Sequence, residues 1–408
     1  MKKKMKKTKK TKQAVSFKCE HCGPIYTSHF GKWSEDLFFV LFPFKISQKR
    51  LSKFALLIDS FLLKIGLLEL TNDIENKKIY FRTKVFIKEA LKDGIKIKAL
   101  KSKHGFINRF QMEHGGKRFY FEGFPRAEFL NGSMTDKIDD KVFVKKVLQK
   151  NNIPSVKGRY FWFFQKSKAI RYAEKNLSYP LIVKPRSGSM SQHVTQNINS
   201  RQKLIEGIKV ANKYSPFFVI EEFLPEMNVY RATVIDNKEV AVVKRIPAHI
   251  VGDGKKTIQE LIELKNQEPE RGEACSEDCT TFKLIFNETS EKILQKRGLS
   301  LKSVLPKGEK LYIQEKVILD IGADIEEVTE TTHSDNKELF LEVSRVFGIK
   351  VVGIDFLAKD ISMSWKNQTC AIIELNSLPY IDTHHHPTYG DPVNIGKYIV
   401  EMVKRYYK

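Results

Sequence analysis

Two late segments of the chain carry polar side chains that could hold a divalent cation. Glu374 and Asn376 close an apolar run near 369–375, and Asp355 lies in another run near 350–357. In an extended strand, residues two apart point to the same face, so Glu374 and Asn376 would lie side by side. Carboxylate and amide oxygens in small number suit magnesium, which keeps waters and shares its other positions with phosphates. Strand-end acids without a metal are an equally open interpretation of this pattern.

A lysine at the end of an apolar strand could contact phosphate. Lys184 ends such a strand and precedes a loop of small residues that contains Ser187, Gly188 and Ser189. The ammonium and the backbone N–H groups of the loop can approach the same phosphate oxygens. Taken alone, however, a strand that ends in Lys-Pro is more often only a strand end.

A third segment could line a slot for adenine. An apolar strand over 217–220 runs into Glu221, Glu222, Phe223 and Leu224. Backbone groups there could read the edge of the base, and a carboxylate could accept a hydrogen bond from the adenine amino group or a ribose hydroxyl. An ordinary strand edge is the simpler reading of this segment by itself.

These groups need elements that position them, and the pattern from residue 77 onward predicts a mixed α+β or α/β architecture. A helix ending near Asp93-Gly94 and a strand over 95–100 indicate a small α/β lobe over 77–135. Thr135–Gln149 reads as a helix whose early acids suit its dipole. The other expected strands cover 118–123, 158–164, 181–183, 217–220, 229–235, 239–246, 350–357 and 369–375, and the other expected helices cover 167–176, 200–213, 257–267, 288–297 and 334–347.

The order and spacing of these pieces resemble the ATP-grasp superfamily. A strand-end lysine, hinge acids about 37 residues later and a closing Asp…Glu-x-Asn are typical of that fold. The long middle motif, 245–272, and the terminal segment 384–390 are similar to one branch, which contains cyanophycin synthetase and the ATP-grasp module of bifunctional glutathione synthetases. The resemblance covers about 135–408. It implies two α+β lobes that grip ATP, over 136–225 and 226–408, preceded by the small α/β lobe.

The resemblance also implies a role for each candidate residue. Lys141 matches a first phosphate-contacting lysine and Lys184 a second, while Arg231 and Arg245 match arginines that face the acyl phosphate or substrate carboxylates. The remaining expected ATP contacts are Ser187, Gly188, Ser189, Glu221, Glu222, Phe223, Leu224 and Asn228, the last at a position where the branch has an acid. The expected ligands of magnesium, with manganese as the alternative, are Asp355, Glu374 and Asn376.

The activity implied by the resemblance is an ADP-forming carbon–nitrogen ligase that joins a carboxylate and an amine through an acyl phosphate. Amino acids or peptides are the expected substrates. Two loops depart from the branch, Ser191–Val194 and Ile318–Ala323. These departures put the acceptor substrate in doubt more than they do ATP binding. We also expect neither the Mur-ligase-like half of cyanophycin synthetase nor the glutamate–cysteine ligase half of the bifunctional enzyme.

Charge supports a rival hypothesis. The 408 residues carry a formal net charge of +23, which favours polyanionic partners. The first twelve residues hold eight lysines and no acid, so 1–16 is expected to be a disordered tail, with polyanion contact as the sharper alternative. A catalytically degenerate grasp protein that binds nucleic acid or anionic surfaces would explain this charge, but not the complete metal set. A ligase that acts on a protein terminus or side chain, with the tail as docking arm, is a third reading.

We recognise no counterpart in the family for residues 1–76, which include the N-terminal extension, 17–76. Cys19 and Cys22 form a CxxC with His29 nearby, but a zinc site needs four ligands and the sequence offers one convincing pair, so ordinary cysteines are the favoured reading. Leu51–Leu70 is expected to be a docked amphipathic helix, and no run of about 18 apolar residues predicts a transmembrane one. Five cysteines do not make a disulfide framework, so we expect a reducing cytoplasm, and a homo-oligomer is compatible with the sequence.

Overall fold

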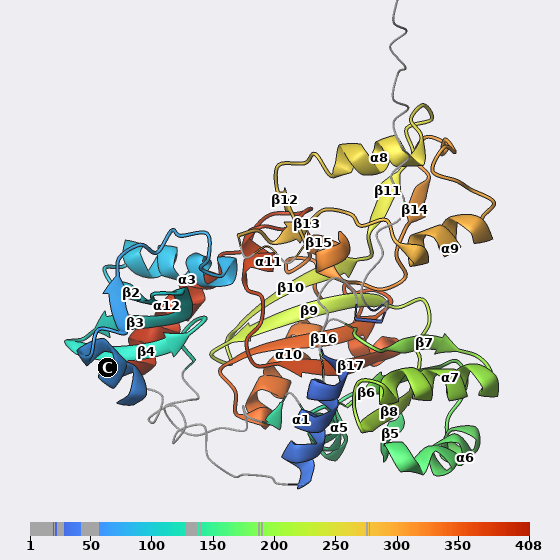
Figure 1. Cartoon of the computed structure of the whole chain (residues 1–408), viewed down its shortest axis with the longest axis horizontal. Helices are drawn as coiled ribbons and strands as arrows, with labels where there is room; N and C mark the ends of the chain where they lie inside the picture. The colour runs from blue at the N-terminus through green and yellow to red at the C-terminus, as the bar shows by residue number, and fades with distance from the viewer. Residues whose placement is uncertain are drawn as a thin grey trace, which may run out of the picture.

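The computed structural model describes residues 19, 21–22, 28–41, 57–126, 137–138, 140–186, 188, 191–274, 276 and 278–408. Within these ranges the strands form three larger sheets and two two-stranded ones. Figure 1 shows the five-stranded sheet in the middle of the view, with a four-stranded sheet to either side. The predicted tail over 1–16 lies outside the described residues, so its disorder stays a prediction. Across the described ranges, no helix is both long and apolar enough to span a membrane.

The first lobe is a four-stranded antiparallel sheet in the order β1-β2-β3-β4, covered by two helices. Helix α12, at the far end of the chain, packs against α3 and adds Ile399 and Val403 to a core that also holds Phe86 and Phe110. The lobe is therefore built from both ends of the chain, which the division at residues 77, 136 and 226 did not foresee; that division stays a prediction. Its elements are β1 Leu68–Thr71, α3 Phe81–Lys92, β2 Lys96–Ser102, β3 Gly105–His114, β4 Lys117–Glu122 and α12 Ile395–Tyr406.

One helix prediction near this lobe was wrong at its C-terminal end. The segment Leu51–Leu70 was expected to be a single helix, but only 57–64 is helical among its described residues. Gly66 takes a positive φ of 72°, and the chain then enters β1, which pairs with β2. The apolar residues at the end of this segment also suit a short edge strand. Pairing with β2, about 30 residues later in the chain, makes them a strand instead of a helix.

The central sheet has the order β15-β10-β9-β16-β17, with every neighbouring pair antiparallel. Helices α5 and α10 share its core, to which Leu148, Phe340 and Phe356 contribute. Helix α5 begins at Lys141 rather than at Thr135, because the Asp140 carboxylate accepts the N–H of Val142 at 2.9 Å and caps it there. The elements are α5 Lys141–Lys150, β9 Asn228–Ile235, β10 Glu239–Ile246, β15 Asp324–Glu327, α10 Ser334–Phe347, β16 Val351–Ala358 and β17 Cys370–Asn376.

The third sheet, in the order β5-β8-β6-β7, carries helices α6 and α7 around a separate apolar core. Helix α1, from the N-terminal extension, docks on this lobe: Asp36 accepts the Ser215 hydroxyl at 2.6 Å, and the Trp33 ring meets the Phe163 ring edge-on at 5.6 Å. The elements are α1 His29–Leu41, β5 Gly158–Trp162, η2 Phe163–Gln165, α6 Lys166–Asn176, β6 Leu181–Pro185, β7 Thr195–Ile198, α7 Arg201–Asn212 and β8 Phe217–Glu222.

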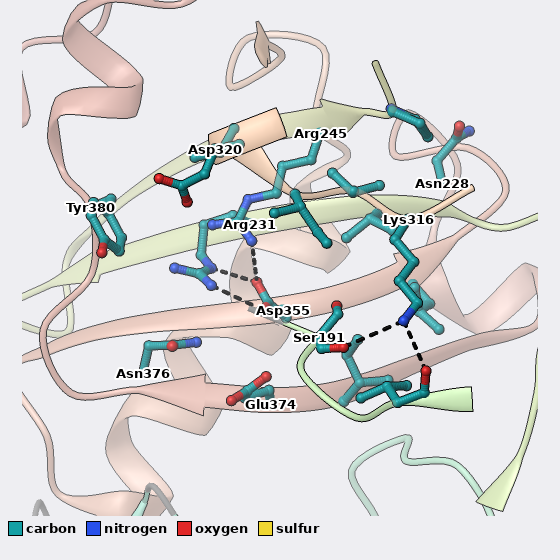
Figure 2. A pocket seen from close by; sticks show the side chains of 18 of the residues that line it. Ser191, Asn228, Arg231, Arg245, Lys316, Asp320, Asp355, Glu374, Asn376 and Tyr380 are labelled. Carbon is teal, nitrogen blue, oxygen red and sulfur yellow. Dashed lines mark hydrogen bonds and ion pairs between the residues drawn. The ribbon is translucent and has the colours of Figure 1, made fainter. Parts of the chain in front are cut away.

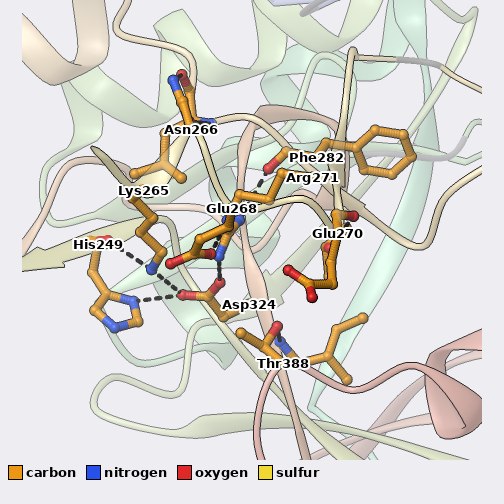
Figure 3. A network of polar contacts seen from close by, with 12 residues as sticks. His249, Lys265, Asn266, Glu268, Glu270, Arg271, Phe282, Asp324 and Thr388 are labelled. Atoms are coloured by element: carbon orange, nitrogen blue, oxygen red, sulfur yellow. Dashed lines mark hydrogen bonds and ion pairs between the residues drawn. The ribbon is translucent and has the colours of Figure 1, made fainter. Parts of the chain in front are cut away.

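The long middle motif builds a small unit above the central sheet, held by a buried polar network (Figure 3). Asp324 is fully buried and pairs with Lys265 at 2.5 Å, with Arg271, and with the His249 ring at 3.2 Å. Much of the motif therefore has a structural role. The elements of this unit and the remaining short ones are β11 His249–Val251, α8 Ile258–Lys265, β12 Arg271–Gly272, β13 Thr281–Phe282, α9 Glu288–Lys296, β14 Lys310–Tyr312, η3 Leu319–Ile321, η4 Trp365–Asn367 and α11 Asp382–His385.

Candidate nucleotide and metal site

A cavity of about 770 Å³ gathers most of the residues that the sequence singled out. Its walls come from β6 and β8, the hinge that follows β8, strands β9, β10, β16 and β17, the loop over 315–320, and Tyr80–Arg82 of the first lobe. The predicted site residues that line it are Lys184, Glu221, Glu222, Phe223, Leu224, Asn228, Arg231, Arg245, Asp355, Glu374 and Asn376. Their individual roles stay predictions, but their convergence on one cavity is a property of the fold.

The remaining predicted residues lie beside the cavity or outside the described part of the chain. Lys141 donates to the Gly188 carbonyl at 3.1 Å and pairs with Glu374 at 3.3 Å, which ties α5 to the loop after β6 and to β17. Ser187 and Ser189 lie outside the described residues.

Strand register places three charged side chains in one row across the central sheet. Asp355 on β16 is directly opposite Arg231 on β9 and Glu374 on β17. Arg231 holds the Asp355 carboxylate with two bonds, Nε to Oδ1 at 2.5 Å and Nη2 to Oδ2 at 3.0 Å. Arg245 approaches the same carboxylate at 3.7 Å (Figure 2). The row offers cations and anions to one wall of the cavity.

Burial and mutual charge set the ionisation of this row. Burial disfavours the Asp355 carboxylate, but Arg231 and Arg245 outweigh it and hold the pKa of that carboxyl below its ordinary value. Burial and the nearby Arg231 lower the pKa of Arg245 to about 10. At neutral pH both arginines remain charged. They face two acids, Asp355, whose oxygens both accept from Arg231, and Glu374, which pairs with Lys141, so this wall presents guanidinium groups and carboxylates side by side.

Glu374 and Asn376 fit a cation better than Asp355 does. Both line the cavity from the same strand, and the Asn376 side-chain nitrogen is buried without a hydrogen-bond partner in the described structure. That nitrogen is a hydrogen-bond donor and suits an acceptor on a bound group, whereas the amide oxygen of the same side chain can ligate a cation. Both Asp355 oxygens accept from Arg231, so a metal would have to share that carboxylate with the guanidinium. With this proviso, the set of oxygen donors fits magnesium or manganese.

Beside the cavity, Glu221 contacts a lysine that was not among the predicted site residues, Lys145. Glu221, which is 4% exposed, is paired with Lys184 at 2.6 Å and with Lys145. Burial opposes its ionisation, yet the two lysines hold the pKa of Glu221 below its ordinary value. Burial lowers the pKa of Lys145 despite the partner carboxylate. Lys145 could have been recognised, because it follows Lys141 by one helical turn and shares its face.

The hinge after β8 offers fewer free groups than its sequence indicates. The Phe223 N–H donates to the Pro180 carbonyl at 2.8 Å, and Glu222 accepts the Ser178 N–H at 3.0 Å. Asn228 donates to the Lys359 carbonyl at 2.7 Å. Glu226, two residues earlier, is an acid that lines the same cavity.

The loop that departs from the family contributes charged groups of its own. Lys316 donates to the carbonyls of Ser191 at 3.4 Å and Val194 at 2.8 Å and so joins two walls of the cavity (Figure 2). Asp320 lines the cavity on the same side as Arg245 (Figure 2). Neither residue was among the predicted site residues, because the sequence of this loop marked only a departure from the family.

The terminal segment closes the central sheet rather than entering the cavity. His384 is fully buried; its Nδ1 donates to Glu327 at 2.9 Å and its Nε2 lies 2.9 Å from the Thr233 hydroxyl. His385 accepts the Gly396 N–H at 3.1 Å. This similarity to the family is therefore one of architecture.

Comparison with known proteins agrees with this arrangement. No family model matches the chain. It is 30% identical over 351 residues to a cyanophycin synthetase of Trichormus variabilis, an alignment that covers 82% of this chain and 37% of that protein. It is 27% identical over 345 residues to a glutathione biosynthesis bifunctional protein of Clostridium perfringens, covering 82% and 43%. The crystal structure of a bifunctional glutathione synthetase from Pasteurella multocida superposes with a TM-score of 0.61 at 21% identity, covering 81% of this chain and 44% of that one.

The chain belongs to the ATP-grasp superfamily. Its relatives are of the branch that the middle motif predicted, and the expected α+β ATP-grasp fold is confirmed. The ATP-grasp chain spans less than half the length of the relatives described above.

Proposed function

We propose that this ATP-grasp chain is an ATP-dependent carboxylate–amine ligase that forms an amide or peptide bond and releases ADP and phosphate. One observation carries the proposal: a single cavity combines Lys184, two buried arginines and the oxygen donors Glu374 and Asn376. Lysines and arginines suit the phosphates of ATP, and the donors suit the cation that accompanies them. The synthetases among its relatives support the same reaction class.

The reaction would proceed in two steps. A substrate carboxylate oxygen attacks the γ-phosphorus of ATP, the bond to the bridging oxygen breaks, and ADP leaves an acyl phosphate behind. An amine nitrogen then attacks the acyl carbon and forms the C–N bond. The bond between that carbon and the phosphate oxygen breaks, phosphate leaves, and the nitrogen loses a proton. Bound magnesium would neutralise charge on the phosphates. The chain itself mainly positions the groups and offsets charge, with Lys184 and Lys145 on the phosphate side and Arg231 and Arg245 toward the acyl phosphate.

We further propose that the substrates are amino acids or peptides and that the first lobe helps to bind them. Arg82, at the start of α3, lines the cavity with its guanidinium 4.7 Å from the Tyr380 ring centre. Its Nε, like that of Arg245, is buried without a hydrogen-bond partner in the described structure. Two such guanidinium groups facing one cavity suit a substrate carboxylate, which can accept several N–H bonds at once.

The test is ADP release by the purified chain with ATP, magnesium and a panel of amino acids and short acidic or basic peptides, with product masses measured. Substrate-dependent ADP formation with a product one water lighter than its two substrates is the expected result. If no member of the panel stimulates ADP release while the protein binds ATP, the small-substrate proposal fails.

The rival proposal, a degenerate protein that binds polyanions through its basic tail, is separated by deleting residues 1–12. We expect ADP formation on a small substrate to be unchanged. Binding to a polyanion should weaken and lose salt dependence, because the eight deleted lysines no longer displace counterions from the polyanion. Loss of small-substrate turnover would instead favour a macromolecular acceptor docked by the tail. We propose a reducing cytoplasm as the location, because five cysteines in 408 residues do not form a disulfide framework.

A further inference from the structure

Four metal-ligating side chains meet at the junction of the N-terminal extension and the cavity wall. Cys19, Cys22 and His29 come from the extension, and His193 comes from the loop between β6 and β7. One ligand atom from each lies within 4.8 Å of the other three. Cys22 is 3% exposed and His193 is fully buried. The sequence showed only the CxxC and a nearby histidine; the fold supplies the fourth ligand.

Four of the six distances within the cluster are close to the edges of a tetrahedral zinc site. With zinc–sulfur bonds of about 2.3 Å and zinc–nitrogen bonds of about 2.0–2.1 Å, the N–N edge is about 3.3 Å and each S–N edge about 3.5 Å. The two histidine Nε2 atoms are 3.2 Å apart. Cys22 Sγ lies 3.2 Å from His29 Nε2 and 3.4 Å from His193 Nε2, and Cys19 Sγ lies 3.8 Å from His193 Nε2.

A second set of contacts orients His193 for metal binding. Its Nδ1 lies 2.9 Å from the Val210 carbonyl, which can only accept, so Nδ1 carries the proton and Nε2 presents a lone pair to the cluster. The Tyr214 ring stacks on the imidazole with 4.8 Å between the ring centres. The backbone N–H of His193 donates to the backbone carbonyl of His21 at 2.9 Å. Such outer contacts are usual for a histidine that ligates zinc.

We propose that Cys19, Cys22, His29 and His193 bind one zinc ion that fastens the N-terminal extension to the loop between β6 and β7. Two thiolates and two imidazoles in a tetrahedron are a closed donor set typical of structural zinc. Gln192 reinforces the junction, because it donates to the Cys22 carbonyl at 3.2 Å and accepts the Tyr214 hydroxyl at 2.8 Å.

Zinc bound here would stabilise a wall of the cavity. Ser191 and Val194 flank the pair Gln192–His193. Both line the cavity, and their backbone carbonyls accept hydrogen bonds from Lys316. An effect on ATP binding would rest on the proposed function, whereas the metal site itself does not.

The first test is metal analysis of the full chain. Metal is measured after purification without added metal or chelator, and again after the chain is refilled with Zn²⁺. We expect close to one zinc per chain, lost in Cys22→Ser and in His193→Gln and retained in the control Cys370→Ser, whose thiol lies on β17 away from the cluster. Zinc retained by both cluster variants, or iron in place of zinc, would overturn the proposal.

Two further measurements keep the test decisive if a cluster variant fails to fold. The wild-type chain, stripped by a chelator and titrated with Co²⁺, should show the intense visible bands and sulfur-to-cobalt charge transfer of a tetrahedral site with thiolates; a weak octahedral spectrum would refute the site. Hydrogen exchange over 191–194 should quicken on zinc removal and slow on its return. Unchanged exchange would refute the fastening role, and failure of ATP assays with zinc present would bear on the proposed function alone.

Discussion

Replacing Glu374 by Gln separates the site's chemistry from the stability of the fold. The glutamate side chain is 32% exposed and pairs with Lys141 at 3.3 Å. An ion pair of that exposure contributes about 1 kcal/mol or less to stability, since solvent screens it. The amide keeps the shape of the side chain and one acceptor oxygen, and it replaces the other carboxylate oxygen with a neutral NH2 group, so we expect the variant to fold and melt nearly as the wild type does.

The expected loss lies in turnover. If Glu374 helps to hold the cation that neutralises the transferred phosphoryl group, its removal forfeits an electrostatic contact of the kind worth about 3–4 kcal/mol, or a hundred- to thousandfold in rate. The assay is ADP release at saturating ATP and magnesium, beside circular dichroism and a thermal melt. Asn376→Ala, on the same strand face, should behave alike.

A matched control is available on α6. Glu174 is 34% exposed and pairs with Arg201 at 3.1 Å, so it resembles Glu374 in exposure and partner but lies outside the cavity. Glu174→Gln should retain wild-type turnover. Near-normal turnover in Glu374→Gln, or an equal loss in both variants, would refute the assignment of Glu374 to the metal.

Three further predictions concern the charges around the cavity and its supporting unit. Lys184→Ala should raise the dissociation constant for ATP about 10- to 100-fold, measured by calorimetry, because a charge-assisted bond to phosphate contributes about 1.5–3 kcal/mol, whereas Lys3→Ala should not change it; equal small effects would make Lys184 an ordinary strand-end residue. Asp324→Ala should lower the free energy of unfolding by about 3–5 kcal/mol in a denaturant titration, because it leaves Lys265, Arg271 and His249 without their buried partner, while the exposed Asp391→Asn should have little effect; a similar small change in both would show that the network contributes little. The pKa of Glu221 is lowered in the folded state, so its stabilisation is complete above its ordinary value of 4.5 and is lost as the pH falls toward the folded value. As the pH is lowered below 4.5, the melting temperature should therefore fall less steeply in Glu221→Gln than in the wild type. Parallel curves of melting temperature against pH would contradict the lowered pKa.

The elements that bear the site could be predicted because their signals are local. Apolar runs that end in a charged residue marked β6, β8, β16 and β17, and helical periodicity marked α6, α7 and α10. Glu374 and Asn376 were predicted to share a face because residues two apart in any strand do. Short strands such as β7 and β11 to β15 were missed, since two to four residues carry too little periodicity and are strands only through their partners.

The partners of the charged residues depended on the tertiary structure. Arg231 and Asp355 are 124 residues apart, and only the antiparallel register of β9 and β16 sets them opposite one another and gives Asp355 a guanidinium where the sequence predicted a metal ligand. Helix α12 was not among the predicted helices, and nothing local assigns it to a lobe formed by the other end of the chain.

The proposed zinc site shows the same division between local and long-range information. The sequence alone determined that Cys19 and Cys22 lie three residues apart, and with only this pair in view it favoured ordinary cysteines. His193 lies 174 residues from Cys19 and belongs to a loop that the sequence assigned to phosphate. Spacing along the chain specifies which side chains share a face of one element, whereas folding decides which faces meet, because the apolar cores that bring them together are made from residues far apart in the sequence.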